Sequence, residues 1–135
     1  MRRYVFTLTS VVLTYACLAS STAQPTGVGD TVRLRIGESF VVTEEDVTIH
    51  FDAVIEDSRC PTGVTCVWEG DGVVKLTASK NGQNVSLELH THPNFAGEGS
   101  AHGCRIRLVG LTPHPAADQP VDSRDYVATI VVSKS

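Results

Sequence analysis

The pair Asn81-Gly82 separates two stretches in which apolar and polar residues alternate, and this arrangement predicts a β-hairpin. A two-residue hairpin turn needs positive φ at both central positions, which Asn and Gly adopt most readily. With this pair at the turn, Lys75 lies opposite Glu88 on one face. Three apolar pairs share the other face: Ala78 with Val85, Leu76 with Leu87 and Val74 with Leu89. A shift by one residue would destroy both matches, so the register is well defined.

Short alternating stretches recur along the rest of the chain, separated by Gly, Pro, Asn and Asp. They lie at 32–36, 47–53, 73–79, 85–90, 104–111 and 126–132. No segment sustains the spacing of three and four residues that an amphipathic helix requires. We therefore expect an all-β fold, a single small sandwich or barrel of about seven to eight mostly antiparallel strands.

The first 23 residues have the features of a secretory signal peptide. Two arginines precede an apolar stretch over 4–18, and Ser21-Thr22-Ala23 supplies the small residues that signal peptidase reads. That stretch is too short to span a membrane and nothing comparable follows, so we expect no transmembrane segment in the mature chain. The domain organisation predicted is a signal peptide at 1–23 and one β domain at 24–135, in a secreted, periplasmic or envelope-associated protein.

Cys17 raises an alternative, in which this residue is lipid-modified and becomes the new N-terminus. A lipoprotein signal usually places Leu three residues before the cysteine, with small residues between. Here Leu13 lies four residues before Cys17, and the bulky Tyr15 intervenes. Ordinary cleavage after Ala23 is therefore favoured over a lipid anchor.

The net charge limits the classes of partner. The leader holds two of the eleven Lys and Arg residues and none of the fifteen Asp and Glu residues, so its removal takes the formal net charge from −4 to −6. An acidic chain without basic clusters argues against nucleic acid and against an anionic membrane surface as partners. We expect the partner to be an extracytoplasmic protein or an envelope component.

The stretch EDSRCPTGVTCVWEGDG contains two cysteines, Cys60 and Cys66, in a sequence that favours a tight turn. Cys60-Pro61-Thr62-Gly63 fits a type I turn, which can bring the two Cα atoms to the roughly 5.5 Å that a disulfide requires. Their spacing is unlike zinc pairs and unlike the two-residue redox motif. We expect a Cys60–Cys66 disulfide; a bridge from either residue to Cys104 is the alternative. Cys104 is in phase with the apolar residues after it, so its thiol should point inward.

The residues around these cysteines allow two interpretations. The single tryptophan, Trp68, is expected to pack in the core against the disulfide, as in many sandwiches. An exposed Trp68 would instead mark a recognition loop with Pro61, Thr62 and Gly63. The flanking acids lack an ordered calcium-loop spacing, so we expect a solvated rim partly neutralised by Arg59. These acids are Glu56, Asp57, Glu69 and Asp71.

The stretch LELHTHPNFAGEGSAHGC offers His90, His92 and His102 as candidate ligands for zinc or copper. On a strand, His90 and His92 share the outer face with Glu88, whereas Cys104 should face inward. A solvated polar face with a mobile loop is therefore favoured, and no cofactor is expected. A metal-binding extracytoplasmic protein remains the alternative.

The stretch EDSRCPTGVTCVWEG resembles the signature Asp-Ser-Arg-Cys-Pro-x-Gly-Val-x-Cys-x-Trp-x-Gly of a family of small bacterial extracytoplasmic proteins, many of them lipid-anchored. CRIRLVGLTPHP and DYVATIVV resemble the downstream blocks of that family. The resemblance implies that Cys60 pairs with Cys66, and it implies no activity. The chain departs from the family at Cys17, whose context is a poor lipid-attachment site, and at Cys104.

No catalytic motif is present: the chain has no Gly-x-Ser-x-Gly elbow, no zinc-helix motif and no phosphate-binding loop. We therefore expect a non-catalytic binding or structural β module rather than an enzyme. A second binding class is protease inhibition. The segment CPTGVTCVW distantly resembles the Asn-Pro-Thr-Thr-Gly-x-x-Trp loop of chagasin-like cysteine protease inhibitors, although it lacks the Asn.

Overall fold

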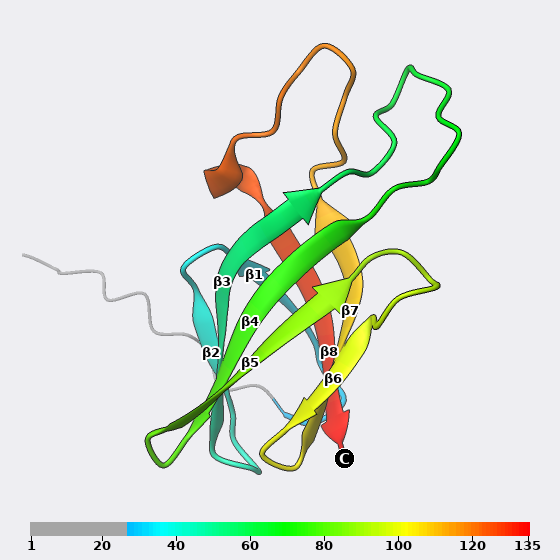
Figure 1. Cartoon of the computed structure of the whole chain (residues 1–135). Helices are drawn as coiled ribbons and strands as arrows, with labels where there is room; N and C mark the ends of the chain where they lie inside the picture. The colour runs from blue at the N-terminus through cyan, green and yellow to red at the C-terminus, as the bar shows by residue number, and fades with distance from the viewer. Residues whose placement is uncertain (1–26) are drawn as a thin grey trace, which may run out of the picture.

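The computed structural model describes residues 27–135, which form two packed antiparallel sheets of four strands each (Figure 1). One sheet has the strand order β1 (Thr31–Arg35), β8 (Val127–Lys134), β7 (Cys104–Thr112) and β6 (Glu98–Ala101). The other has the order β2 (Ser39–Val42), β3 (Val47–Asp57), β4 (Gly72–Lys80) and β5 (Gln83–His90). A short 3₁₀ helix, η1 (Ser123–Asp125), precedes β8. The expected all-β sandwich of about eight strands is confirmed; the predicted signal peptide and Cys17 lie outside the described residues.

The hairpin formed by β4 and β5 has the register that the sequence predicts. Asn81 and Gly82 both have positive φ, 50° and 77°, and Lys75 lies opposite Glu88. The three apolar pairs are aligned as expected: Val74 with Leu89, Leu76 with Leu87 and Ala78 with Val85. Local turn chemistry and the burial of one face therefore specify the same pairing.

The core lies between the two sheets and consists of the inward residues of both. Among the largest fully buried side chains are Phe51, Ile49, Leu76, Leu89, Ile106 and Ile130. Cys104 is completely buried beside them and is not disulfide-bonded, so the inward direction predicted for its thiol is confirmed. Burial raises the pKa of this thiol, and the nearby Glu45 carboxylate raises it further. Cys104 thus behaves as a small apolar core residue.

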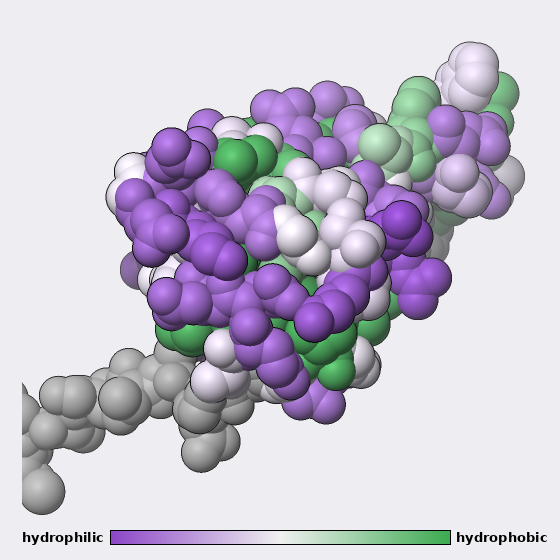
Figure 2. All heavy atoms as spheres, turned by 90° about the horizontal axis from the view of Figure 1, so that it is seen from below, coloured by the Kyte–Doolittle hydropathy of each residue, from purple (hydrophilic) through white to green (hydrophobic). Residues whose placement is uncertain are grey.

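Two long connections project together from one end of the sandwich (Figure 1). Residues 58–71 join β3 to β4 and residues 113–126 join β7 to β8, while 91–97 join β5 to β6 nearby. The far end, seen from below in Figure 2, is covered mainly by hydrophilic residues with small apolar patches between them. No helix within the described residues is long and apolar enough to cross a membrane.

Candidate functional site

Residues 58–71 are here called the disulfide loop. They leave the sandwich through a neck, formed by 58–60 and 69–71, whose two sides are joined by backbone hydrogen bonds. Ser58 N donates to the Asp71 carbonyl at 2.7 Å, and Cys60 N donates to the Glu69 carbonyl at 2.9 Å. Gly70 has a φ of +70°, and a Cβ at this position would lie 1.8 Å from the Ser58 carbonyl oxygen. Only glycine therefore permits the two sides of the neck to approach this closely.

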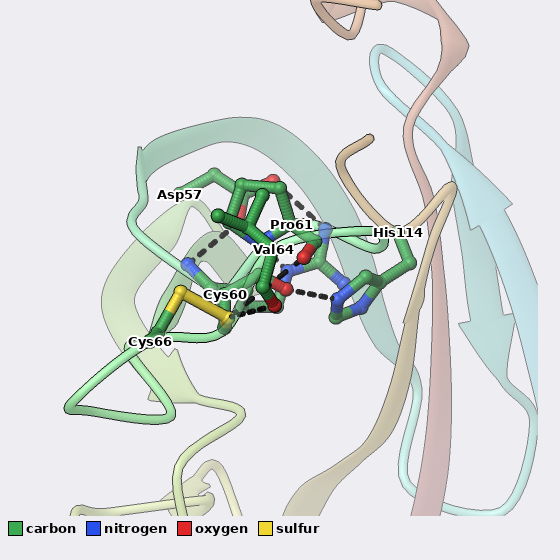
Figure 3. Close-up of a disulfide and its surroundings, with 7 residues drawn as sticks. Asp57, Cys60, Pro61, Val64, Cys66 and His114 are labelled. Carbon is green, nitrogen blue, oxygen red and sulfur yellow. Dashed lines mark hydrogen bonds and ion pairs between the residues drawn. A yellow bond between two sulfur atoms is a disulfide. The ribbon is translucent and has the colours of Figure 1, made fainter. Parts of the chain in front are cut away.

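Beyond the neck, a Cys60–Cys66 disulfide closes the loop, with a Cα–Cα distance of 5.8 Å (Figure 3). The pairing predicted from the turn sequence is confirmed. Residues 61–68, here called the tip, begin within this closed ring and continue just past it. In Figure 3, His114 points toward Cys60 from the β7–β8 connection, and its Nε2 lies 2.7 Å from the Cys60 carbonyl oxygen. The loop is thus fixed covalently within itself and by hydrogen bonding to a neighbouring segment.

A buried ion pair fixes the base of the loop. Arg59 donates from Nε to Asp57 Oδ1 at 2.7 Å and from Nη2 to Asp57 Oδ2 at 2.8 Å, with 8% and 9% of the two side chains exposed. Tyr126 donates its hydroxyl to the same carboxylate at 2.8 Å. The expectation of a solvated acidic rim is therefore wrong at Asp57, because the chain folds these groups inward and supplies both donors.

The electrostatics of this cluster follow from its contacts. Burial alone would raise the pKa of Asp57, but the hydrogen bonds from Arg59 and Tyr126 outweigh it and lower that pKa. Burial and the hydrogen bond to Asp57 raise the pKa of Tyr126 to about 12. At neutral pH the cluster is thus an ionised carboxylate held by a guanidinium and a neutral phenol.

Arg59 also ties the disulfide loop to the other sheet. Its Nη1 donates to the Leu111 carbonyl at 2.6 Å, and its Nη2 donates to the Pro113 carbonyl at 2.8 Å. Thr62 N donates to the Pro115 carbonyl at 2.9 Å, which adds a backbone contact further out along the loop. The loop is therefore held against the β7–β8 connection, and the two project from the same end of the sandwich in Figure 1.

The expectation that Asp71 belongs to a solvated rim is also wrong, because its carboxylate is nearly buried and receives several donors. Its Oδ2 lies 2.5 Å from His90 Nδ1, and its Oδ1 accepts from the backbone N–H groups of Thr91 and His92, each at 3.0 Å. Burial opposes ionisation, yet the hydrogen bonds from His90 and His92 lower the pKa of Asp71. This carboxylate joins the start of β4 to the end of β5.

The apolar residues of the tip point into solvent. Trp68 is 82% exposed, Val67 94% and Val64 50%. The prediction that Trp68 packs in the core is therefore wrong. The neck carries the tip beyond the strand ends, and side chains of the two sheets already fill the core. Thr62 and Gly63 are exposed and Pro61 is half-buried, so the four residues predicted as a recognition loop do lie on one presented segment.

Trp68 lines a groove of about 620 Å³ between the disulfide loop and the 91–97 connection, here called the aromatic groove. Phe95, 57% exposed, lines it as well, and its ring centroid lies 5.4 Å from that of His90 and 5.2 Å from that of His92. A smaller hollow of about 310 Å³ adjoins it, sharing Gly70 and His92. Phe95 was missed by the sequence analysis; its only signal is a single large apolar residue in a polar connection.

The three candidate metal ligands do not converge. His90 and His92 both lie at the end of the sandwich from which the disulfide loop projects, here called the loop end. There His92 Nε2 is 3.8 Å from Glu69 Oε2. His102 lies in the β6–β7 turn with its Nε2 3.1 Å from the Gln83 carbonyl oxygen, at the start of the strand that ends at His90. Seven residues of β-strand span about 23 Å, so one ion cannot bind all three. No group of three potential ligands occurs within 27–135.

Comparison of the chain with protein-family models, curated proteins and solved structures finds no match. The chemistry of the site is therefore inferred from its own geometry. The two buried carboxylates, Asp57 and Asp71, are occupied by donors from the chain itself. Several large apolar side chains are exposed here as well, among them Trp68 and Phe95, and such residues are suited to recognition.

Proposed function

We propose that this chain is a non-catalytic binding module that recognises a protein partner through the tip of the disulfide loop. The carrying observation is the exposure of Val67 and Trp68 on a loop fixed at its base. Tryptophan is the residue type most enriched among side chains that dominate binding energy. Large apolar side chains exposed side by side, rather than scattered singly, are typical of interaction sites.

The loop is prepared for binding because several constraints fix it before any partner arrives. The Cys60–Cys66 disulfide, the backbone pairs of the neck and the contacts of Arg59 each remove conformational freedom. A segment that is already ordered loses less entropy on association. The far end of the sandwich is mainly hydrophilic on the face shown in Figure 2, where apolar residues form only small patches.

The compartment proposed for this activity is extracytoplasmic: a secreted, periplasmic or envelope-associated location. A disulfide is stable in oxidising compartments. The predicted leader at 1–23 agrees with export. The partner would accordingly be an extracytoplasmic protein or an envelope component.

Site-specific photocrosslinking in the producing cells tests this function. A photoreactive phenylalanine derivative at position 67 should give a covalent adduct of discrete mass. The control is the same residue at position 83, because Gln83 is exposed at the opposite end of the sandwich. Adducts of equal yield from both positions, or none from position 67, would contradict the proposal.

Protease inhibition is a second candidate, favoured by the covalently closed loop with an apolar tip. Such a loop can occupy an enzyme cleft without the loss of order that a flexible peptide incurs. Micromolar protein should then slow papain, and Trp68→Ala should weaken the effect. Full papain activity in the presence of the unaltered protein would exclude inhibition of this enzyme class while leaving the recognition of other proteins open to the crosslinking test.

A further inference from the structure

The aromatic groove carries negative charge without a permanent cation. Glu56 and Asp71 both line it, and none of its lining residues, all within the described part of the chain, is Lys or Arg. The only basic groups there are the imidazoles of His90 and His92. The nearest arginine in sequence, Arg59, is committed to Asp57 at the base of the loop.

The two carboxylates of the groove differ in whether they can bind a group from outside the protein. The hydrogen bonds to Asp71 lower its pKa despite its burial, so it contributes a fixed negative charge at the floor. Glu56 is exposed near the end of β3, and its side chain makes no hydrogen bond or ion pair with any residue in 27–135. Glu56 is therefore free to pair with a group supplied from outside.

The groove also has two exposed aromatic rings, those of Trp68 and Phe95. The face of an aromatic ring attracts a cation, and tryptophan does so most strongly. Both rings remain accessible although each is large enough to favour burial. A groove that combines aromatic faces with the unpaired Glu56 carboxylate is complementary to a cation with an apolar stem, the chemistry of arginine and lysine side chains.

We propose that the aromatic groove receives an arginine or lysine side chain of the protein partner. The side chain packs its aliphatic stem against Trp68 and Phe95 and directs its charged group toward Glu56. This inference rests on the proposed function and specifies the partner's chemistry: the recognised segment is basic. An acidic segment would meet the Glu56 and Asp71 charges, and a wholly apolar segment would leave Glu56 unpaired.

Fluorescence titration with short peptides tests this inference directly, since Trp68 is the only tryptophan of the chain. The probes are acetyl-Gly-Arg-Gly-amide and the same peptide with citrulline, which keeps the shape of arginine but lacks its charge. The arginine peptide should change Trp68 emission saturably, with a dissociation constant of about 1 mM, as suits a ligand with few contacts. The citrulline peptide should bind at least about fivefold more weakly.

Matched variants locate the interaction. Glu56→Gln should weaken binding of the arginine peptide about threefold. Asp46→Asn removes one negative charge in the turn between β2 and β3, at the opposite end, and should leave binding unchanged. Because these variants retain Trp68, they keep the fluorescence signal. Phe95→Leu should weaken the arginine peptide and leave the already weak citrulline binding nearly unchanged.

The outcomes separate this inference from the function on which it rests. Equal binding of the two peptides, equal effects of Glu56→Gln and Asp46→Asn, or no saturable change with the arginine peptide up to about 20 mM would overturn the cation inference. A position-67 crosslink that survives Glu56→Gln in full yield would likewise overturn it while leaving the binding function intact. Absence of a position-67 crosslink in the protein that retains Glu56 would overturn the function itself.

Discussion

The guanidinium of Arg59 holds Asp57 through two hydrogen bonds, from Nε at 2.7 Å and from Nη2 at 2.8 Å, with both side chains nearly buried. The same tripeptide, Asp-Ser-Arg, recurs at 122–124. There Arg124 contacts Asp122 with matching geometry, at 3.0 Å from Nε and 2.7 Å from Nη2, but in solvent. The protein thus contains a buried and an exposed version of one local ion pair.

Arg59→Ala should lower the free energy of unfolding by about 3 kcal/mol, because it leaves Asp57 buried without its cation. Arg124→Ala should cause no measurable loss, since that arginine side chain is 86% exposed and water replaces it. Urea denaturation of the two variants beside the parent protein measures both effects. Similar losses from the two substitutions would show that Arg59 is not specially important to the loop end.

Acid should destabilise the protein through Asp57. The pKa of Asp57 is lower in the folded than in the unfolded chain. Its contribution to the free energy of unfolding is therefore fully present above the unfolded pKa of about 3.9, and it is lost as the pH falls through the folded pKa. The free energy of unfolding should therefore decline below about pH 4. Asp57→Asn should be less stable at neutral pH yet show a shallower decline, measured by urea titration at several pH values. A parallel decline in both proteins would assign acid sensitivity to other groups.

Gly70→Ala should open the neck of the disulfide loop, because the added Cβ would lie 1.8 Å from the Ser58 carbonyl. Gly63→Ala is the matched control: it also has a positive φ, +83°, but nothing lies within 4 Å of its Cβ. The control should cost about 1 kcal/mol from backbone strain alone, and Gly70→Ala clearly more. Amide hydrogen exchange at Ser58 and Cys60 should accelerate only in Gly70→Ala. Equal exchange in the two variants would contradict the role assigned to the close approach.

Trp68→Ala should leave the free energy of unfolding within about 0.5 kcal/mol of the parent value, because the side chain is 82% exposed. A core aromatic gives the contrast: Phe51→Ala should cost about 3–5 kcal/mol. Thermal and urea denaturation measure both. A large loss of unfolding free energy in Trp68→Ala would indicate that Trp68 packs in the core, as the sequence predicts.

The parts of the fold predicted from sequence are those that short-range rules determine. The β4–β5 register follows from Asn81-Gly82 and the apolar phase on either side, and the inward thiol of Cys104 follows from alternation along one strand. The two four-residue strands, β2 and β6, were missed. The sequence of β6, EGSA, has no apolar alternation, so its strand conformation depends on pairing with β7.

The candidate site was less predictable because it depends on where the long connections lie. The direction of Trp68 is set by the neck, which holds the tip beyond the core. Burial of Asp57 and Asp71 requires donors distant in sequence, such as Tyr126 for the first and His90 for the second. The sequence around the disulfide loop shows that charged residues are present, but it does not show which distant side chains will contact them in the folded protein.

The closure of the neck by main-chain groups has a consequence for how such a scaffold can diversify. Within 27–135, the polar contacts between residues 62–68 and the rest of the protein use main-chain atoms of 62–68. The Thr62 backbone pairs with Pro115 and Ala117, the Val64 carbonyl lies 3.6 Å from Cys60 Sγ, and the ring itself is closed by sulfur. Side chains at positions 64, 67 and 68 can therefore be exchanged at little cost to folding. Related sequences sharing the same framework would be free to acquire different partners by altering only these outward positions.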